Sequence, residues 1–243
     1  MFYKKNQSEE LDNRLFENPS SEYRGTPFWA WNCKPNTEIL GEQIEYLKEM
    51  GFGGFHIQSR TGVAVPYLSE EFMGLVKFCT DKAKNENMLA YLYDEDRWPS
   101  GAAGGLVTKN PRFRARYIEF SPEQIPHFSV DEAINEGKTY LLCVYDIVLN
   151  NNGELSEYRR ISEDEDALGR KWYVYIKSCE ESPWYNNQTY VDTLSKDAID
   201  EFIKITYNSY KDAVGDEFGK TIPSIFTDEP QFTVKKPLGF ADS

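Results

Sequence analysis

Three short apolar segments alternate with two helical segments in the first hundred residues, and this order limits the fold more than any other feature. The apolar segments cover residues 26–32, 52–58 and 89–93. Between them, apolar residues recur at helical spacing over residues 37–50 and 70–79. This order predicts an α/β fold with parallel strands. In such sheets and in (β/α)8 barrels, the carboxyl ends of the strands carry the chemistry.

The rhythm changes after residue 110, where the segments alternate as antiparallel strands do. We expect four such strands, at residues 116–120, 139–149, 157–161 and 171–177. The α/β pattern then resumes: Ser195 can cap a helix with one apolar stripe, and residues 222–226 predict a fourth parallel strand.

The spacing of the predicted parallel strands indicates a partial barrel. They start at residues 27, 53, 89 and 223. A β/α repeat takes roughly 30 residues, so the last interval holds about 100 inserted residues. We therefore predict a partial (β/α)8 (TIM-type) barrel with an antiparallel β module inserted between strand 3 and helix 3. The expected divisions are an N-terminal arm (1–25), barrel repeats (26–110), the β-rich module (111–190), and helix 3 with strand 4 and a tail (191–243).

Composition excludes several classes of function. Lys and Arg number 27 against 40 Asp and Glu, a net charge of −13, which disfavours partnership with nucleic acids or anionic membranes. No apolar run approaches the roughly 18 residues of a membrane span, and the first residues lack a signal peptide's apolar core, so we expect a cytoplasmic protein. The four cysteines form no C-x-x-C pair and are expected to be reduced and mostly buried. With two histidines, acid–base chemistry must come mainly from carboxylates.

Glu229 is the leading candidate for a catalytic residue, and Asp228 beside it is a further candidate. Glu229 follows the fourth predicted strand, after Asp228 and before Pro230. A carboxyl group partly removed from water at a strand end can have its pKa raised into the range of a general acid. The alternative is a surface Asp-Glu turn closed by proline.

A second carboxylate cluster follows the third strand. Asp94, Glu95 and Asp96 could bind a hard cation, contact sugar hydroxyls or raise one another's pKa, and Glu95 is a further catalytic candidate. Trp98 and the turn after it make the loop aromatic. The alternative is a solvated acidic loop.

Further polar and aromatic residues lie at the first two strand ends. Residues two apart share one side of a strand, so we expect three side chains to line one cleft with Glu229: His56, Gln58 and Arg60. Trp31 and Asn32 offer a stacking face and an amide, although at least one of Trp29 and Trp31 is expected in the core. Aromatic faces with amides, carboxylates and arginine are typical of carbohydrate recognition.

Five segments in this order resemble the N-terminal half of the catalytic barrel of α-L-rhamnosidase-like glycoside hydrolases, family 106 and its uncharacterised relatives. They are Thr26-Pro-Phe-Trp-Ala-Trp-Asn32, Gly51-Phe-Gly-Gly-Phe-His-Ile57, Pro66-Tyr-Leu-Ser-Glu-Glu71, Tyr91-Leu-Tyr-Asp-Glu-Asp-Arg-Trp-Pro-Ser-Gly101, and Gly219-Lys-Thr-Ile222 with Phe226-Thr-Asp-Glu-Pro230. The resemblance implies a (β/α)8 barrel that hydrolyses glycosidic bonds with carboxylate acid and base groups, and calcium is associated with characterised members of the family. It places Glu229 at the end of strand four, where many barrel glycosidases keep their general acid.

The leading hypothesis is therefore a glycoside hydrolase fragment acting on a carbohydrate such as a rhamnose-containing glycan. The two alternatives are a non-catalytic carbohydrate-binding module and a half-barrel that functions only when assembled. A half-barrel leaves its first and fourth strands as open edges. Its inward side chains would then lose half their packing partners, and we expect these side chains to be Phe28, Phe55, Leu92 and Phe226. We expect a homodimer, or the chain's own arm or β module, to close these edges.

Overall fold

The computed structural model describes residues 9–10 and 12–232. The chain divides into two compact units. The first runs to Gly104 and includes Asp200–Pro230, and the second takes Gly105–Ile199 and continues from Gln231. No helix in the described part of the chain has the length and apolar character needed to cross a bilayer.

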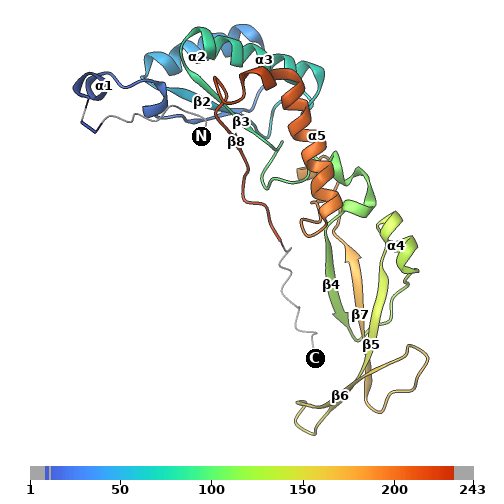
Figure 1. The fold of residues 1–243 in the computed structure, drawn as a ribbon. Coiled ribbons are helices and arrows are strands. Elements are labelled where there is room, and N and C mark those ends of the chain that lie inside the picture. Colours follow the sequence, from blue (N-terminus) through green and yellow to red (C-terminus); the bar gives the residue numbers. More distant parts are fainter. Residues whose placement is uncertain (1–8, 11, 233–243) are drawn as a thin grey trace. The chain divides into compact units, whose positions relative to one another are not determined.

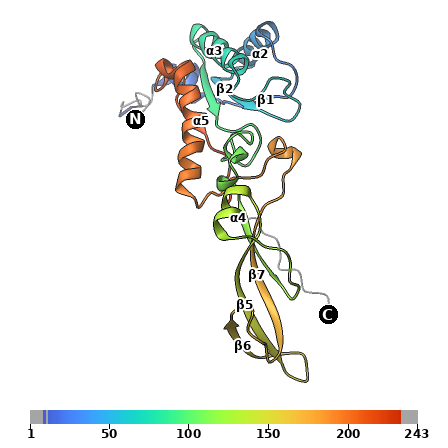
Figure 2. The same ribbon diagram turned by 90° about the vertical axis from the view of Figure 1, so that its right-hand side faces the viewer.

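The first unit is built on four parallel strands in the order β1-β2-β3-β8. They are β1 (Phe28–Trp31), β2 (Gly54–Ser59), β3 (Leu89–Tyr93) and β8 (Ile225–Phe226). Helices α2 (Thr37–Glu49) and α3 (Glu70–Asn85) lie together over one face of this sheet (Figures 1 and 2). The predicted strands and helices of this unit are confirmed, as is the α/β class.

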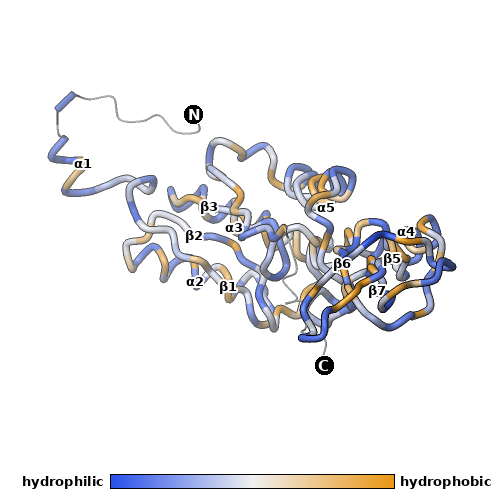
Figure 3. Tube along the Cα trace, turned by 90° about the horizontal axis from the view of Figure 1, so that it is seen from below, coloured by the Kyte–Doolittle hydropathy of each residue, from blue (hydrophilic) through white to orange (hydrophobic). Residues whose placement is uncertain are grey.

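Helix starts in this unit follow from side-chain caps. The Asn36 side chain accepts a hydrogen bond from the backbone N–H of Ile39, and Ser69 accepts one from Phe72. Such caps satisfy backbone donors that the first helical turn leaves unpaired. A third helix, α5 (Lys196–Val214), alternates apolar and polar segments along its length (Figure 3). The short helix α1 (Asn13–Glu17) precedes the sheet.

The apolar core lies between the sheet and its helices. The strands contribute Trp31, Phe55, Ile57 and Leu92, and the helices contribute Leu40, Ile44, Phe72, Val76, Tyr210 and Val214. The prediction that Phe55 and Leu92 point to the inner side is therefore wrong. Both side chains are buried on the helix side. Side chains alternate between the two faces along a strand, and the register places Phe55 and Leu92 on the same face as Trp31.

The opposite face of the sheet carries aromatic residues from all four strands. Register places Phe28 opposite His56 and His56 opposite Tyr91. The rings of Phe28 and Phe226, on the two edge strands, lie 5.0 Å apart between centroids. Three strand spacings in a flat sheet would span roughly 14 Å, so the sheet curves around this face. A partial barrel remains a prediction.

The second unit is built on an antiparallel sheet in the order β4-β7-β5-β6 (Figure 1). Its strands are β4 (Arg116–Ser121), β5 (Tyr140–Leu149), β6 (Leu155–Ile161) and β7 (Arg170–Ser178), which confirms the four predicted strands. Helix α4 (Val130–Glu136) begins at a capping box of Ser129 and Glu132 and ends at Gly137, whose φ of 69° favours glycine. Short 3-10 turns elsewhere in the chain are Ser21–Tyr23, Val107–Lys109, Pro111–Phe113, Pro183–Tyr185 and Gly215–Glu217.

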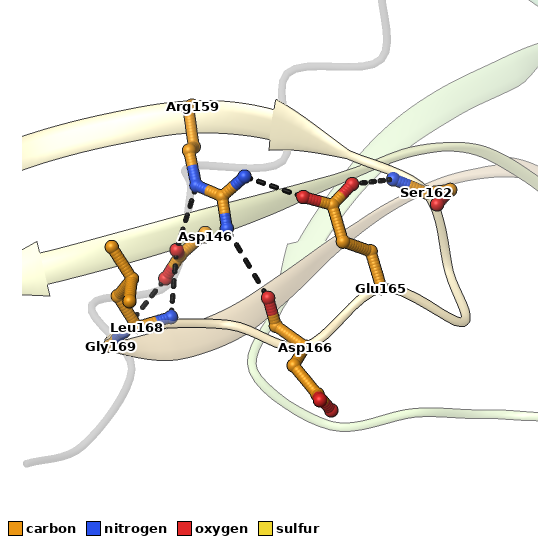
Figure 4. Close-up of polar contacts among 7 residues, drawn as sticks. All are labelled: Asp146, Arg159, Ser162, Glu165, Asp166, Leu168 and Gly169. Carbon is orange, nitrogen blue, oxygen red and sulfur yellow. Dashed lines mark hydrogen bonds and ion pairs between the residues drawn. The ribbon is translucent and has the colours of Figure 1, made fainter.

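A buried carboxylate fixes the loop between β6 and β7 (Figure 4). Asp146 accepts hydrogen bonds from the backbone N–H groups of Leu168 and Gly169, both at 2.9 Å, and from Arg159 Nε at 3.2 Å. The backbone donors, with Arg159, hold the pKa of Asp146 below its usual range. Arg159 also pairs with Glu165, so this cluster ties the loop to the sheet.

The four cysteines are free thiols. Cys79 is buried, whereas Cys143 and Cys179 are half-buried and Cys33 is exposed. The expectation of mostly buried thiols therefore holds fully only for Cys79.

Candidate functional site

Glu229 is exposed just beyond the end of β8. Trp98 donates a hydrogen bond from its indole Nε1 to Glu229 Oε2 at 3.1 Å. The φ of Glu229 is +42°, a left-handed conformation that is uncommon for glutamate. Residues held in such conformations cluster at active sites and ligand-binding segments.

Asp228 is fixed by contacts on its side chain and its backbone. Its Oδ2 accepts a hydrogen bond from the Tyr93 hydroxyl at 2.7 Å, and its backbone N–H donates to Ser100 Oγ at 2.9 Å. Burial, with the neighbouring Asp228 carboxylate, raises the pKa of Tyr93 well above its usual value. Gln58 hydrogen-bonds the same tyrosine hydroxyl, which links the end of β2 to the segment that carries Glu229.

Asp94 directly follows β3 and is fully buried. Its carboxylate accepts hydrogen bonds from three hydroxyl groups: Ser100 at 2.6 Å, Thr227 at 2.7 Å and Tyr207 at 2.8 Å. Burial raises the pKa of Asp94, and the hydroxyl donors oppose this rise. Asp94 therefore joins β3 to the loop after it, to α5 and to the segment after β8.

Glu95 has a different role from the one expected. It is buried, and its two oxygens accept hydrogen bonds from the backbone N–H groups of Asp96, Gly101, Ala102, Ala103 and Gly104. Burial raises the pKa of Glu95 to about 7, and these donors oppose the rise. In this geometry Glu95 organises the loop from inside, and the prediction that it acts on substrate is not supported.

Asp96 completes the buried carboxylates of this loop. It accepts a hydrogen bond from Ser59 Oγ at 2.7 Å and pairs with Arg97 Nε at 3.4 Å. The alternative of a solvated acidic loop is therefore wrong for all three residues, whose side chains are buried and bonded.

The four polar candidates at the ends of β1 and β2 lie in two different places. His56 and Gln58 share the aromatic face of the sheet, where His56 stacks on Tyr91 with ring centroids 4.5 Å apart. Burial lowers the pKa of His56, and its Nδ1 donates to the Thr26 carbonyl at 3.1 Å. Asn32 and Arg60 are exposed beyond the ends of β1 and β2.

Trp31 is buried on the helix side of the sheet, with its ring 5.6 Å from that of Phe72. A side chain in this position packs in the core and does not reach a ligand. Trp31 is therefore removed from the candidate ligand-binding residues. Trp98 remains one of them, because it contacts Glu229.

Sequence reasoning did not find the hydroxyl groups that hold these carboxylates. Tyr93, Ser100, Thr227 and Tyr207 contact either Asp94 or Asp228. Tyr93 and Thr227 each lie directly before an acidic residue at a strand end, and this position could have identified them as hydrogen-bond donors to the carboxylates. Tyr207 lies more than a hundred residues from Asp94, and only the tertiary structure brings them together.

The carboxylates at this edge do not fit a calcium site. Both oxygens of Glu95 face N–H donors, and those of Asp94 face hydroxyl groups that donate to them. Calcium needs six to eight oxygen ligands with lone pairs directed at the ion. Among the described residues, no three His, Cys, Asp or Glu side chains gather as a metal site.

Comparisons with known proteins give little further information. No family model matches the chain, and no curated protein sequence matches it. Among solved structures, the rhamnosidase from Novosphingobium sp. PP1Y is similar with a TM-score of 0.38 and 17% sequence identity. The match covers 59% of this chain, which spans only 17% of the length of that protein. A likeness of this size carries no argument about activity.

Proposed function

We propose that this chain provides part of the active site of a glycoside hydrolase of the α-L-rhamnosidase-like class, with Glu229 as the general acid. The single observation that carries the proposal is the position of this carboxyl group, exposed at the carboxyl end of a parallel strand and bonded to the Trp98 indole. A carboxyl beside an aromatic ring can meet a sugar that stacks on that ring. The sequence motifs that surround Glu229 and Trp98 give additional support.

The chemistry assigns one step to Glu229. Its proton passes to the glycosidic oxygen as the bond from that oxygen to the anomeric carbon breaks, and Glu229 is left as a carboxylate. Asp228 acts as a positioning residue, because its bonds to Tyr93 and Ser100 fix the backbone that carries Glu229. Trp98 orients the carboxyl group through its indole N–H.

Hydrolysis also needs a second carboxyl group, about 5 Å away for retention or 6.5–9.5 Å for inversion. Asp94, Glu95 and Asp96 are buried and bonded, so they do not supply it. We propose that a second copy of the chain, which closes the sheet edges at β1 and β8, supplies it from an exposed carboxyl group. The aromatic side chains on the inner face of these two edge strands are partly exposed, Phe28 by 52% and Phe226 by 36%, which leaves apolar surface that a partner can cover.

A second candidate function is carbohydrate binding without turnover. The burial of the three carboxylates after β3 favours it. Only the carboxyl groups of Asp228 and Glu229 then remain at this edge of the sheet to contact a ligand, and no separate pair of acid and base groups is present among the described residues there. The two candidates differ in whether a bound glycoside is cleaved.

Glu229→Gln is expected to lower the rate of aryl rhamnoside hydrolysis by at least about a hundredfold, because general acid catalysis contributes 10²–10⁴-fold. Release of the aryl group measures the rate. Glu49→Gln, an exposed glutamate at the end of α2, is the matched control and should leave the rate unchanged. Light scattering after size exclusion tests whether the active species is a dimer.

Binding without hydrolysis in the unmodified chain would favour the second candidate. Hydrolysis that survives Glu229→Gln would remove Glu229 from the mechanism. If the chain neither binds nor cleaves a rhamnoside, both candidates are contradicted.

A further inference from the structure

The antiparallel sheet of the second unit carries a row of four aromatic side chains on one face, one from each strand. In sheet order they are Phe120 on β4, Trp172 on β7, Tyr145 on β5 and Tyr158 on β6. Register places Tyr145 directly opposite Trp172, and residues that pair across strands share a face. We call this row the aromatic row.

The rings of the aromatic row form a continuous surface. Ring centroids are 4.7 Å apart for Phe120 and Trp172, and 6.4 Å apart for Tyr145 and both Phe120 and Tyr158. Phe120 is 40% exposed and Tyr158 is 68% exposed. Three strand spacings give the row a length of roughly 14 Å. Tyrosine and tryptophan side chains are enriched at sites of interaction, because they combine an apolar ring with a polar group.

The two faces of this sheet differ in charge. The charged strand residues on the face of the aromatic row are Arg116, Arg160 and Arg170, with no Asp or Glu among the described strand positions of that face. The acidic residues of these strands lie on the other face of the sheet: Glu119, Asp146 and Glu157. That other face is also covered, since Ile125 and Ala167 pack against it.

The arginines bring positive charge to an otherwise acidic chain of net charge −13. Arg160 pairs with Tyr145 across β5 and β6, and Arg170 pairs with Ile147 across β5 and β7. Both therefore flank the aromatic row near Tyr145 and Tyr158. A guanidinium group binds a carboxylate through two parallel hydrogen bonds, so this arrangement favours an anionic ligand.

We propose that the aromatic row binds a saccharide chain that carries carboxylate groups. The C–H faces of successive pyranose rings stack on the aromatic rings, and Arg160 and Arg170 bind the carboxylates. The choice of a saccharide over a single-stranded nucleic acid rests on the proposed function.

Calorimetry with the full chain and an oligogalacturonate tests the proposal. Phe120→Ala and Tyr158→Ala are each expected to weaken binding by up to about tenfold, from the energy of an aromatic contact. Phe128→Ala is the matched control: Phe128 is also 40% exposed in the same unit but lies outside the strands. It should leave binding unchanged.

Charge recognition is tested with a matched probe. A methyl-esterified oligogalacturonate has the same chain without the carboxylate charge and should bind more weakly than the free acid. Arg160→Gln should reduce this difference, because Arg170 remains, whereas Arg112→Gln, an exposed arginine outside the sheet, should retain it in full. Tyr158 and Arg160 are exposed, so these variants should fold, and circular dichroism checks that they do.

Three outcomes would overturn the proposal. Equal effects of Phe120→Ala and Phe128→Ala would show that the row makes no contact. Tighter binding of single-stranded RNA would assign the surface to nucleic acid, and a dimer that Tyr158→Ala dissociates would assign it to a second copy. The unmodified and Glu229→Gln chains should bind the oligogalacturonate equally, so the proposal can fail independently of the proposed catalytic function.

Discussion

Replacing Glu95 with glutamine is expected to lower the free energy of unfolding by about 3–5 kcal/mol, since each buried N–H group left without an acceptor costs about 1–3 kcal/mol. The two oxygens of Glu95 accept five backbone N–H bonds. The NH2 group of glutamine cannot accept any of them, so at least two donors lose their partner. Urea denaturation measures the change.

The matched control is Glu42→Gln, at an exposed position in the middle of α2. The same change of side chain there should alter the free energy of unfolding by less than about 0.5 kcal/mol. If Glu95→Gln is equally harmless, the loop does not depend on this carboxylate.

The difference in stability between the unmodified chain and Glu95→Gln should also depend on pH. Burial raises the pKa of Glu95 from 4.5 to about 7 in the folded chain. The folded chain then binds more protons than the unfolded chain between these values, so the contribution of Glu95 to stability falls as pH rises through this window. Glutamine does not titrate, and the difference should narrow from pH 4.5 to 7. A difference that widens would show that the N–H donors outweigh burial.

Gly54→Ala is expected to destabilise the chain by about 3 kcal/mol, in the range of substitutions that force backbone shifts in a packed core. Gly54 starts β2 and pairs with Leu89 of β3. A Cβ atom at this position would lie 2.3 Å from the backbone oxygen of Leu89, closer than real Cβ contacts allow. The two central strands would have to separate, and thermal and urea denaturation would both record the loss.

Gly74→Ala provides the comparison for Gly54→Ala. Gly74 lies within α3 and is exposed, and a Cβ atom there meets nothing within 4 Å. Alanine should stabilise the helix by about 1 kcal/mol, because glycine is a poor helix former. Opposite signs for the two variants are expected, and a shared sign would contradict the packing described for Gly54.

The sequence predicted the elements of this fold well, because each carries a local signal. Asn36 and Ser69 mark helix starts, and the antiparallel strands of the second unit are rich in tyrosine, valine and isoleucine, which favour strands. The inner and outer faces of the parallel strands were harder to predict, since these strands are apolar on both sides. Phe55 was assigned to the wrong face for this reason.

The candidate site was predicted only in part, for a related reason. The edge of the sheet could be predicted, since polar residues follow each strand, but a carboxylate that binds sugar and one that holds a loop look alike in sequence. Glu95 lies beside Asp94 and Asp96, and only the approach of five N–H groups from residues 96–104 distinguishes its role. Contacts of Tyr207 with Asp94 depend on chain segments far apart in sequence.

The pairing of β3 with β8 has a consequence for the order of folding. Leu92 and Ile225 pair although 133 positions separate them, so the chain must close a long loop before this pair can form. The second unit brings Arg114 and Val191 together in a bridge of its own. If that unit folds first, the loop that remains to be closed shortens by more than half, which lowers its entropic cost by roughly 0.7 kcal/mol, at about 0.6 kcal/mol per doubling of length. The second unit then holds Arg114 and Val191 close together, and β8 should join the parallel sheet late, after the second unit has formed.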